Sequence, residues 1–137
     1  MSPFSQILRD LRVKRNLRQK DAAELLGYEQ SYLSSLEIGL KGPPKKAFIK
    51  QLISKLELNE SEQQQLMDAL NSSKRQYTLP LKASIEEYEI FSKLEPYLGN
   101  LNSQQIALMN VVLNIGDALQ TQTQQRSAVT EREEPRM

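Results

Sequence analysis

Apolar side chains recur every three or four residues along the first seventy positions, and short polar or glycine-containing breaks separate the runs. This spacing is typical of amphipathic helices that turn one face toward a core. The first predicted helix begins at Pro3 and ends near Asn16, the next two cover 19–26 and 30–38, the fourth carries Phe48 to Leu56, and the fifth follows Asn59. Gly27 and Gly39 would end the second and third helices, because glycine readily adopts the left-handed conformation of a helix C-terminus.

The rest of the chain holds one polar break and two further helical patterns. Residues 71–82 are polar, contain Pro80 and are expected to be a linker. Ser84 would cap a helix that ends before, or kinks at, Pro96, and a turn at Gly99 would precede a helix over 103–119. Since no strand pattern is visible, the predicted fold is all-α. It comprises a five-helix domain at 1–70, a linker at 71–82, a helical hairpin at 83–119 and a disordered tail at 120–137.

The composition excludes several kinds of chemistry. The chain has no Cys and no His, which removes disulfides, thiolate metal sites and most nucleophile–base pairs. We therefore expect no enzyme, no cofactor and no metal site. The longest apolar stretch is interrupted by Asn110 and Asn114 and is shorter than the roughly 18 residues of a membrane span, so a cytoplasmic protein without a membrane partner is expected.

The charge is unevenly distributed along the chain. Residues 1–56 contain eleven Lys and Arg against five Asp and Glu, a net charge of +6, whereas the remainder carries −5. A basic first half favours a polyanionic partner, although a solvated charged surface would give the same pattern.

The stretch 19–39 combines close packing with an exposed polar helix. A small side chain at Ala23 would let two helices approach, Gly27 would make the turn between them, and Leu33 would fill the space beneath. These features are typical of a helix-turn-helix. The other side of the 30–38 helix is short and polar, so it could enter the major groove and hydrogen-bond to base edges.

Residues 7–56 resemble the DNA-binding domain of the Cro and phage-repressor (Xre-type) family of bacterial and phage regulators. The matching positions are Leu11-Arg12, Leu17 to Gln19, Ala23, Leu26-Gly27, Ser31 to Ser34 and Leu36 to Gly39. The resemblance implies a repressor-like helix-turn-helix domain of five helices. It also implies a sequence-specific transcription regulator, most often a repressor, that binds double-stranded DNA in the bacterial nucleoid or, if phage-encoded, in the host cytoplasm.

The same resemblance assigns roles to individual positions. Base reading falls to Gln30, Ser31 and Ser35, and backbone or mixed contacts fall to Gln19, Tyr32, Ser34, Lys41, Lys45 and Lys46. Arg12 and Glu37 match a pair that is a buried ion pair in the family. Simple helix capping is an alternative role for Gln19, and plain solvation is one for Lys45 and Lys46. Packing against the fourth helix is expected for Tyr28 but not for Tyr32.

The last predicted helix is apolar on most sides, so it must be buried on most sides. A homodimer would achieve this through Ile106, Met109, Val112 and Leu113, and packing within the chain is the alternative. A homodimer suits a repressor that reads an inverted repeat. The competing function is an antitoxin, in which 83–119 binds a protein partner while the N-terminal half represses its own operon.

Overall fold

The computed structural model describes residues 1–117, so the predicted tail at 120–137 and the end of the last predicted helix lie outside the described residues. The helices are α1 (Pro3–Lys14), α2 (Gln19–Leu26), α3 (Gln30–Ile38), α4 (Lys46–Lys55), α5 (Glu60–Asn71), α6 (Ile85–Leu94) and the 3-10 helix η1 (Glu95–Tyr97). Residues 103–117 are also helical, and no strand occurs in residues 1–117. The prediction of an all-helical fold is confirmed. The chain divides into two compact units, Met1–Thr78 and Leu79–Met137, which are described separately.

Several helices begin at hydrogen-bonded capping pairs that are local in the sequence. At the start of α5, the Glu62 N–H donates to Asn59 Oδ1 at 2.8 Å and the Asn59 N–H donates to Glu62 Oε1 at 3.1 Å. The helix at 103–117 begins with the same reciprocal arrangement between Asn102 and Gln105, at 2.8 and 3.0 Å. Each pair satisfies N–H groups that the first turn of a helix leaves without a partner.

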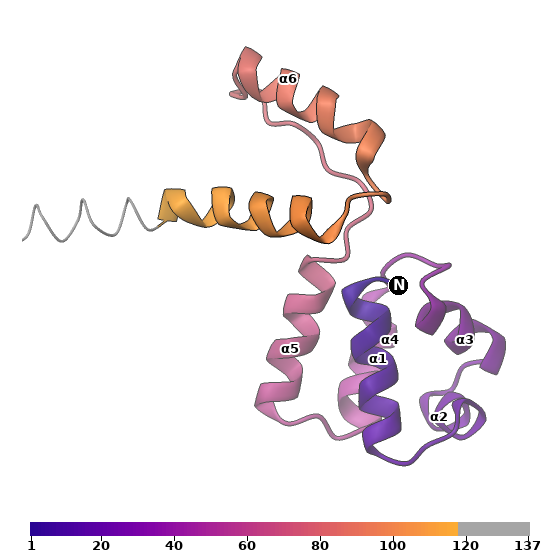
Figure 1. Ribbon diagram of the computed structural model, residues 1–137. Helices are drawn as coiled ribbons and strands as arrows, with labels where there is room; N and C mark the ends of the chain where they lie inside the picture. Colours follow the sequence, from indigo (N-terminus) through magenta and orange to yellow (C-terminus); the bar gives the residue numbers. More distant parts are fainter. Residues whose placement is uncertain (118–137) are drawn as a thin grey trace, which may run out of the picture. The chain divides into compact units, whose positions relative to one another are not determined.

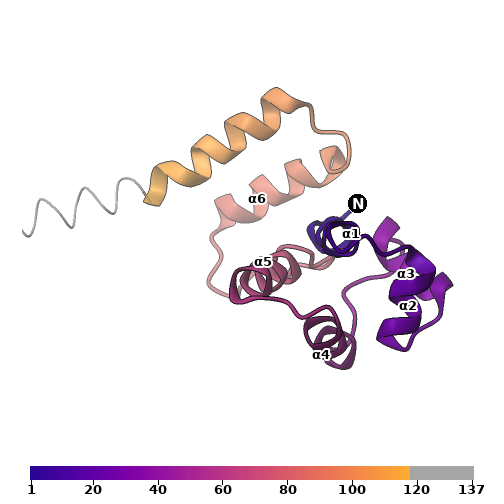
Figure 2. The same cartoon turned by 90° about the horizontal axis from the view of Figure 1, so that it is seen from below.

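The first unit is built around α1. This helix packs against α3 on one side and α5 on the other, while α2 packs against α3 and α4 (Figures 1 and 2). The core contains apolar side chains from all five helices and from the α4–α5 connection: Phe4, Leu8, Leu11, Ala22, Ala23, Leu26, Leu33, Leu36, Phe48, Leu52, Leu56, Leu58 and Leu66. Burial of the apolar faces therefore fixes the arrangement of the five helices.

The first unit extends past the end of α5. The Phe4 N–H donates to Ser73 Oγ at 2.8 Å, and the Ser73 hydroxyl donates to the Ala69 carbonyl at 2.5 Å. Ser73 is buried, and its hydroxyl satisfies an N–H in the first turn of α1. The beginning of the stretch predicted as a linker is thus fastened to the core.

The second unit consists of α6, η1 and the helix at 103–117. The chain reverses around Gly99, which has a φ of +91°, and the helix at 103–117 runs back in roughly the opposite direction to α6 (Figures 1 and 2). None of residues 79–117 is buried. Among the helices of residues 1–117, none is both long and apolar enough to cross a membrane.

Candidate nucleic-acid interface

The turn between α2 and α3 depends on one glycine. Gly27 has a φ of +80°, and the next residue, Tyr28, donates its N–H to the Ala23 carbonyl at 2.9 Å. Ala22 and Ala23 are almost fully buried where α2 meets its neighbours, so no larger side chain separates the helices. A left-handed turn after a short helix and a small residue at the crossing together present α3 as an outer helix.

The outer side of α3 is polar and accessible. Gln30 and Ser31 are exposed, and Ser34 and Ser35 are half-buried. The Ser35 hydroxyl donates to the Ser31 carbonyl at 2.9 Å, so its proton is already engaged and its oxygen remains available as an acceptor. Of the three residues predicted to read bases, Gln30 and Ser31 are therefore the freest to donate hydrogen bonds.

An aromatic cluster of three rings connects α3 to α4. The rings of Tyr28 and Tyr32 stack at a centroid distance of 5.4 Å, and each meets the Phe48 ring of α4 edge-on, at 5.1 and 5.8 Å respectively. The expectation that Tyr32 would not pack against the fourth helix was therefore wrong. Tyr28 lies just before the N-cap of α3 and Tyr32 in its first turn, and both rings contact Phe48. Burial raises the pKa of the Tyr32 hydroxyl, and the nearby Tyr28 adds to this effect.

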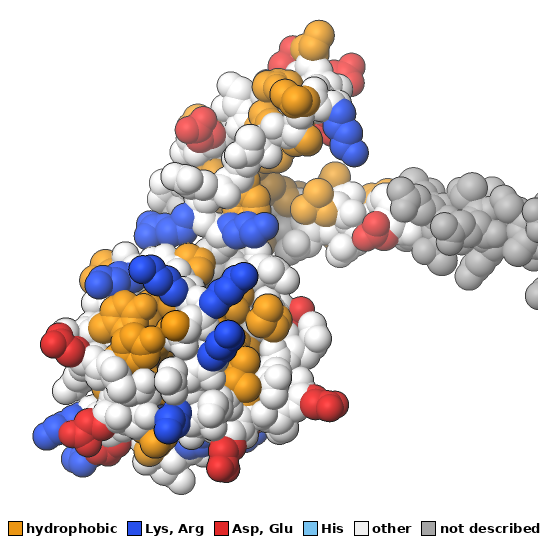
Figure 3. Space-filling model, turned by 180° about the vertical axis from the view of Figure 1, so that it is seen from behind, with side chains coloured by type: hydrophobic (Ala, Val, Ile, Leu, Met, Phe, Trp, Pro, Cys, Tyr) orange, Lys and Arg blue, Asp and Glu red, His pale blue; other side chains and the backbone are white. Residues whose placement is uncertain are grey.

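Basic side chains lie beyond the end of α3. Lys41, Lys45 and Lys46 are exposed, and the Lys41 ammonium sits 5.1 Å above the centre of the Tyr32 ring. Figure 3 shows Lys and Arg side chains gathered around an apolar patch on the side of the first unit where α4 lies. This arrangement places positive charge next to the polar surface of α3.

Gln19 is not the cap of α2. The N-cap position is Arg18, whose side chain makes no capping hydrogen bond, and Gln19 is the first residue inside the helix. Its side chain is half-buried. The capping alternative for Gln19 therefore has no support in the structure.

Lys41 lines a small hollow together with Arg75. The hollow has a volume of about 200 Å³, and its lining contains no Asp or Glu: Met1, Ser2, Phe4, Gly39, Lys41, Gly42, Pro43, Ser73 and Arg75. Sequence reasoning missed Arg75 because it placed this residue in a linker. The long-range hydrogen bond of Ser73, which holds the segment against α1, has no signal in the local sequence.

The structure brings Arg12 and Glu37 together. The Arg12 Nε lies 3.1 Å from both carboxylate oxygens of Glu37, and Arg12 Nη2 lies 2.8 Å from Oε1. Arg12 Nη1 also donates to the Leu17 carbonyl at 2.8 Å. The Glu37 side chain is 4% exposed and that of Arg12 is 14% exposed, so the pair joins α1, α3 and the α1–α2 connection instead of facing solvent.

A second ion-pair cluster, which sequence reasoning missed, joins α1 to α5. The Glu62 carboxylate accepts from Arg15 at 2.9 and 3.0 Å and lies 3.4 Å from the Lys14 ammonium. The hydrogen bonds from Arg15 are the main reason that the pKa of Glu62 falls to about 2, against an ordinary 4.5. The capping box at Asn59 was readable from the sequence, but the partners 47 and 48 residues away were not.

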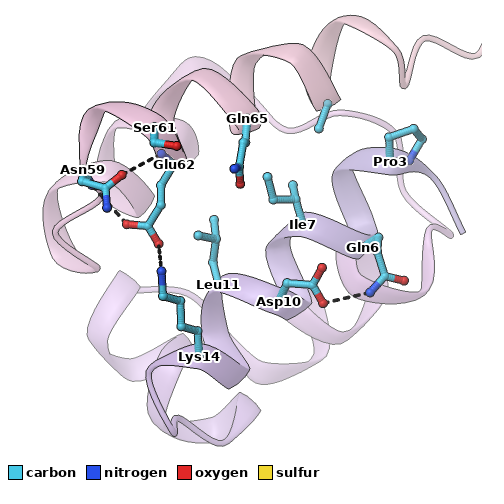
Figure 4. A pocket seen from close by; sticks show the side chains of 11 residues that line it. Pro3, Gln6, Ile7, Asp10, Leu11, Lys14, Asn59, Ser61, Glu62 and Gln65 are labelled. Carbon is cyan, nitrogen blue, oxygen red and sulfur yellow. Dashed lines mark hydrogen bonds and ion pairs between the residues drawn. The ribbon is translucent and has the colours of Figure 1, made fainter.

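A further hollow on the first unit lies between α1 and α5. It has a volume of about 480 Å³, with Ile7 and Leu11 among its lining residues (Figure 4). Its polar groups bind one another: Lys14 pairs with Glu62, and the Gln6 amide donates to Asp10 at 2.9 Å. Its lining comes from α1, α5 and Asn59, and includes no residue of α3. None of its buried polar side-chain atoms lacks a hydrogen-bond partner.

The four residues predicted for a dimer interface all lie on the helix at 103–117. Ile106, Val112 and Leu113 are 48%, 66% and 71% exposed, whereas Met109 is half-buried.

Comparison with known proteins gives one match. Residues 4–66 match a protein family described as a helix-turn-helix domain. Neither the search of curated proteins nor the search of solved structures returned a match. The matched residues run from α1 into α5 and contain the α2–α3 pair, which is consistent with the resemblance to Xre-type domains. Such a domain indicates DNA binding and a role in transcription regulation. Residues 4–66 of this chain are thus similar to a helix-turn-helix domain.

Proposed function

We propose that this protein is a sequence-specific transcription regulator, acting as a repressor, that binds an inverted repeat as a homodimer. The observation that carries the proposal is the exposed polar side of α3, held rigidly by the buried Arg12–Glu37 pair. Lysines flank it, and none of Lys41, Lys45 and Lys46 forms an ion pair within residues 1–117. A rigid outer helix beside free positive charge suits the major groove and its phosphates.

In this proposal Gln30 supplies most of the sequence preference. Its amide can bind adenine through two hydrogen bonds, whereas the hydroxyls of Ser31 and Ser35 discriminate less strictly between bases. Ser34 and Tyr32 would make backbone or mixed contacts.

Phosphate binding falls to a separate group of side chains: Gln19, Lys41, Lys45, Lys46 and Arg75. Phosphate contacts set position and affinity without reading sequence, so these residues should act alike on any duplex. Residues 1–70, with the anchored segment as far as Arg75, would then be the DNA-binding part, the rest of 71–82 the linker and 83–119 the part that joins two copies.

Two substitutions separate base reading from phosphate binding. Gln30→Ala should cost about 1–3 kcal/mol on the operator, little on scrambled DNA, and relax selection at one base pair of each half-site. Lys45→Ala should weaken both duplexes alike and lower the salt slope by about 1 for each phosphate that the protein no longer neutralises. The measurement is a titration of each variant on both duplexes over a range of salt concentrations. An equal loss for Gln30→Ala on both duplexes would mean that α3 does not read bases.

The homodimer predicts the layout of the operator. Half-sites should lie about 34 Å apart, one helical turn from centre to centre, on one face of the duplex. A footprint of the bound operator gives this spacing directly. A single protected half-site would remove the inverted-repeat part of the proposal.

An antitoxin is the second candidate function, and the exposed apolar side chains of the second unit favour it. An antitoxin would use that surface to bind a protein partner while the first unit represses its own operon. Stoichiometric co-purification with a small partner encoded next to the gene would support it over the homodimeric repressor.

A further inference from the structure

The second unit leaves nearly all its apolar side chains in solvent. Between residues 85 and 115 twelve large apolar side chains are exposed: Ile85, Tyr88, Ile90, Phe91, Tyr97, Leu98, Ile106, Leu108, Val111, Val112, Leu113 and Ile115. None of residues 79–117 is buried, so this unit has no core of its own. So many exposed apolar side chains on one small unit indicate an interaction site.

The helix at 103–117 has one polar side and two apolar ones. At 100° per residue, Asn110 and Asn114 fall on one side, with Ser103 and Asp117 beside them. One apolar side carries Ile106, Met109 and Leu113, and the other, which we term the open face, carries Leu108, Val111, Val112 and Ile115. Met109, at the centre of its side, is the one half-buried side chain in 103–117 and so already has neighbours within the chain, although Ile106 and Leu113 beside it are 48% and 71% exposed. The open face is 49–66% exposed.

We propose that the open face binds the open face of a second copy of this chain, so that two helices pair about a two-fold axis. The inference rests on the homodimer of the proposed function and shifts its interface from the Met109 side to the open face. It therefore retains Val112 of the four residues predicted from the sequence and replaces the others.

Charge favours a second copy as the occupant. Residues 103–116 contain no charged side chain, so two identical helices can meet without bringing like charges together. By contrast, α6 carries Glu86, Glu87 and Glu89 against a single basic residue, Lys93, and two copies of α6 face to face would repel. The two helices at 103–117 therefore lie at the centre of the dimer, with each α6 at its edge.

The area involved requires α6 as well. Complete burial of an aliphatic side chain contributes about 1.5–3 kcal/mol, which at about 25 cal/mol per Å² corresponds to roughly 60–120 Å². The four partly exposed residues of the open face therefore supply only about 140–280 Å². A standard interface buries about 800 Å² on each partner. The aromatic side chains Tyr88 and Phe91 lie on the side of α6 opposite Glu86 and Glu89 and can contribute much of the remainder, with the carboxylates left in solvent.

The first test is a pair of matched charge substitutions in the full-length protein. Val111→Lys places a charge on the open face, and Asn110→Lys places the same charge one residue away on the polar side. In sedimentation equilibrium we expect a dimer for the wild type and Asn110→Lys at micromolar concentration, and a dimer weakened at least about a hundredfold for Val111→Lys. A monomeric wild type, or equal dissociation constants for the two variants, would overturn the inference.

The second test uses single cysteines, because the chain has none of its own. Val→Cys and Leu→Cys changes keep an apolar side chain, so folding is little disturbed, and residues near a two-fold axis can form a disulfide with their own copy. Oxidation should give a covalent dimer for at least one of Leu108→Cys, Val111→Cys, Val112→Cys and Ile115→Cys, and none for Asn114→Cys. Cross-linking through Met109→Cys alone would overturn the open face as the interface.

The same variants separate failure of this inference from failure of the proposed function. Val111→Lys should lose affinity for a duplex with two half-sites while still preferring one half-site over scrambled DNA. If the wild type binds all duplexes alike, sequence-specific recognition fails, while the sedimentation data still decide the interface. If Val111→Lys binds the two-half-site duplex as tightly as Asn110→Lys does, the open face does not join the DNA-bound copies and the inference fails.

Discussion

Replacing Glu37 by Gln should sharply destabilise the helix-turn-helix domain without touching its DNA-facing surface. The substitution keeps the volume and shape of the side chain but removes its charge. Arg12 would keep its bond to the Leu17 carbonyl and lose its counterion. The Gln amide group would also present N–H donors to a guanidinium that has donors only.

The magnitude follows from the burial of the pair. Glu37 is 4% exposed and Arg12 is 14% exposed, so water can replace little of the attraction that the substitution removes. Removing one partner of a buried pair costs about 3–5 kcal/mol, because the other charge stays uncompensated. For a domain of this size, a destabilisation of about 3 kcal/mol lowers the thermal midpoint by at least about 12 °C.

Urea unfolding followed by far-UV circular dichroism measures this change, and Asp21→Asn is the matched control. Asp21 pairs with Arg18 at 2.9 Å, but these side chains are 39% and 82% exposed, so the control should change the midpoint little. An unchanged midpoint for Glu37→Gln, or equal shifts in the two variants, would refute the reasoning.

Three further predictions concern other parts of the first unit. The pKa of Glu62 is depressed to about 2 from 4.5, so its ion pairs stabilise the fold fully above pH 4.5 and lose this contribution as the pH falls toward 2. The excess stability of wild type over Glu62→Gln, at most about 3 kcal/mol, should therefore vanish over that range in acid titrations of unfolding. Gly27→Ala should cost about 1 kcal/mol in urea unfolding, from backbone strain alone, because a Cβ there meets no atom within 4 Å. Arg75→Gln should lower the salt slope of DNA binding by about 1 for each copy, or about 2 for the dimer, with no change in sequence preference, whereas an unchanged slope would remove Arg75 from the phosphate-binding group.

The helices of the first unit were predictable because their signals are local. Apolar spacing, the glycines at 27 and 39 and the capping box at Asn59 each act within a few residues, and the structure contains all of them. By contrast, the hydrogen bond between Phe4 and Ser73 joins residues that are 69 positions apart. In the sequence alone, a serine after the end of a helix indicates only the beginning of a linker. Long-range polar partners are chosen by the packed fold, so they become visible only in three dimensions.

The candidate site shows the same division. Polarity along one side of α3 was readable from its periodicity, but the packing of Tyr32 on Phe48 and the bond from Ser35 to Ser31 were not. The ring contact and the hydrogen bond each depend on the rotamer that the Tyr32 or Ser35 side chain adopts in the folded protein. Arg75 was missed because its position beside Lys41 follows from the anchoring of Ser73.

A single first unit discriminates weakly between DNA sequences, and a single second unit leaves its apolar side chains exposed. The proposed dimer would change both properties. One copy of α3 offers a single long base-reading side chain, Gln30, and one good bidentate contact discriminates by only about 1–3 kcal/mol. The second unit has no buried residue within 79–117 and needs a partner to cover it. Pairing two copies covers that surface and makes the second half-site contact intramolecular, which can raise affinity by about 10²–10⁴ without any new base contact.

The segment between Arg75 and Ser84 is eight residues long, and a flexible chain of this length has a root-mean-square end-to-end distance of about 16 Å. That distance is close to half of the roughly 34 Å between successive major-groove sites, so each copy can reach its own half-site from a shared two-fold axis.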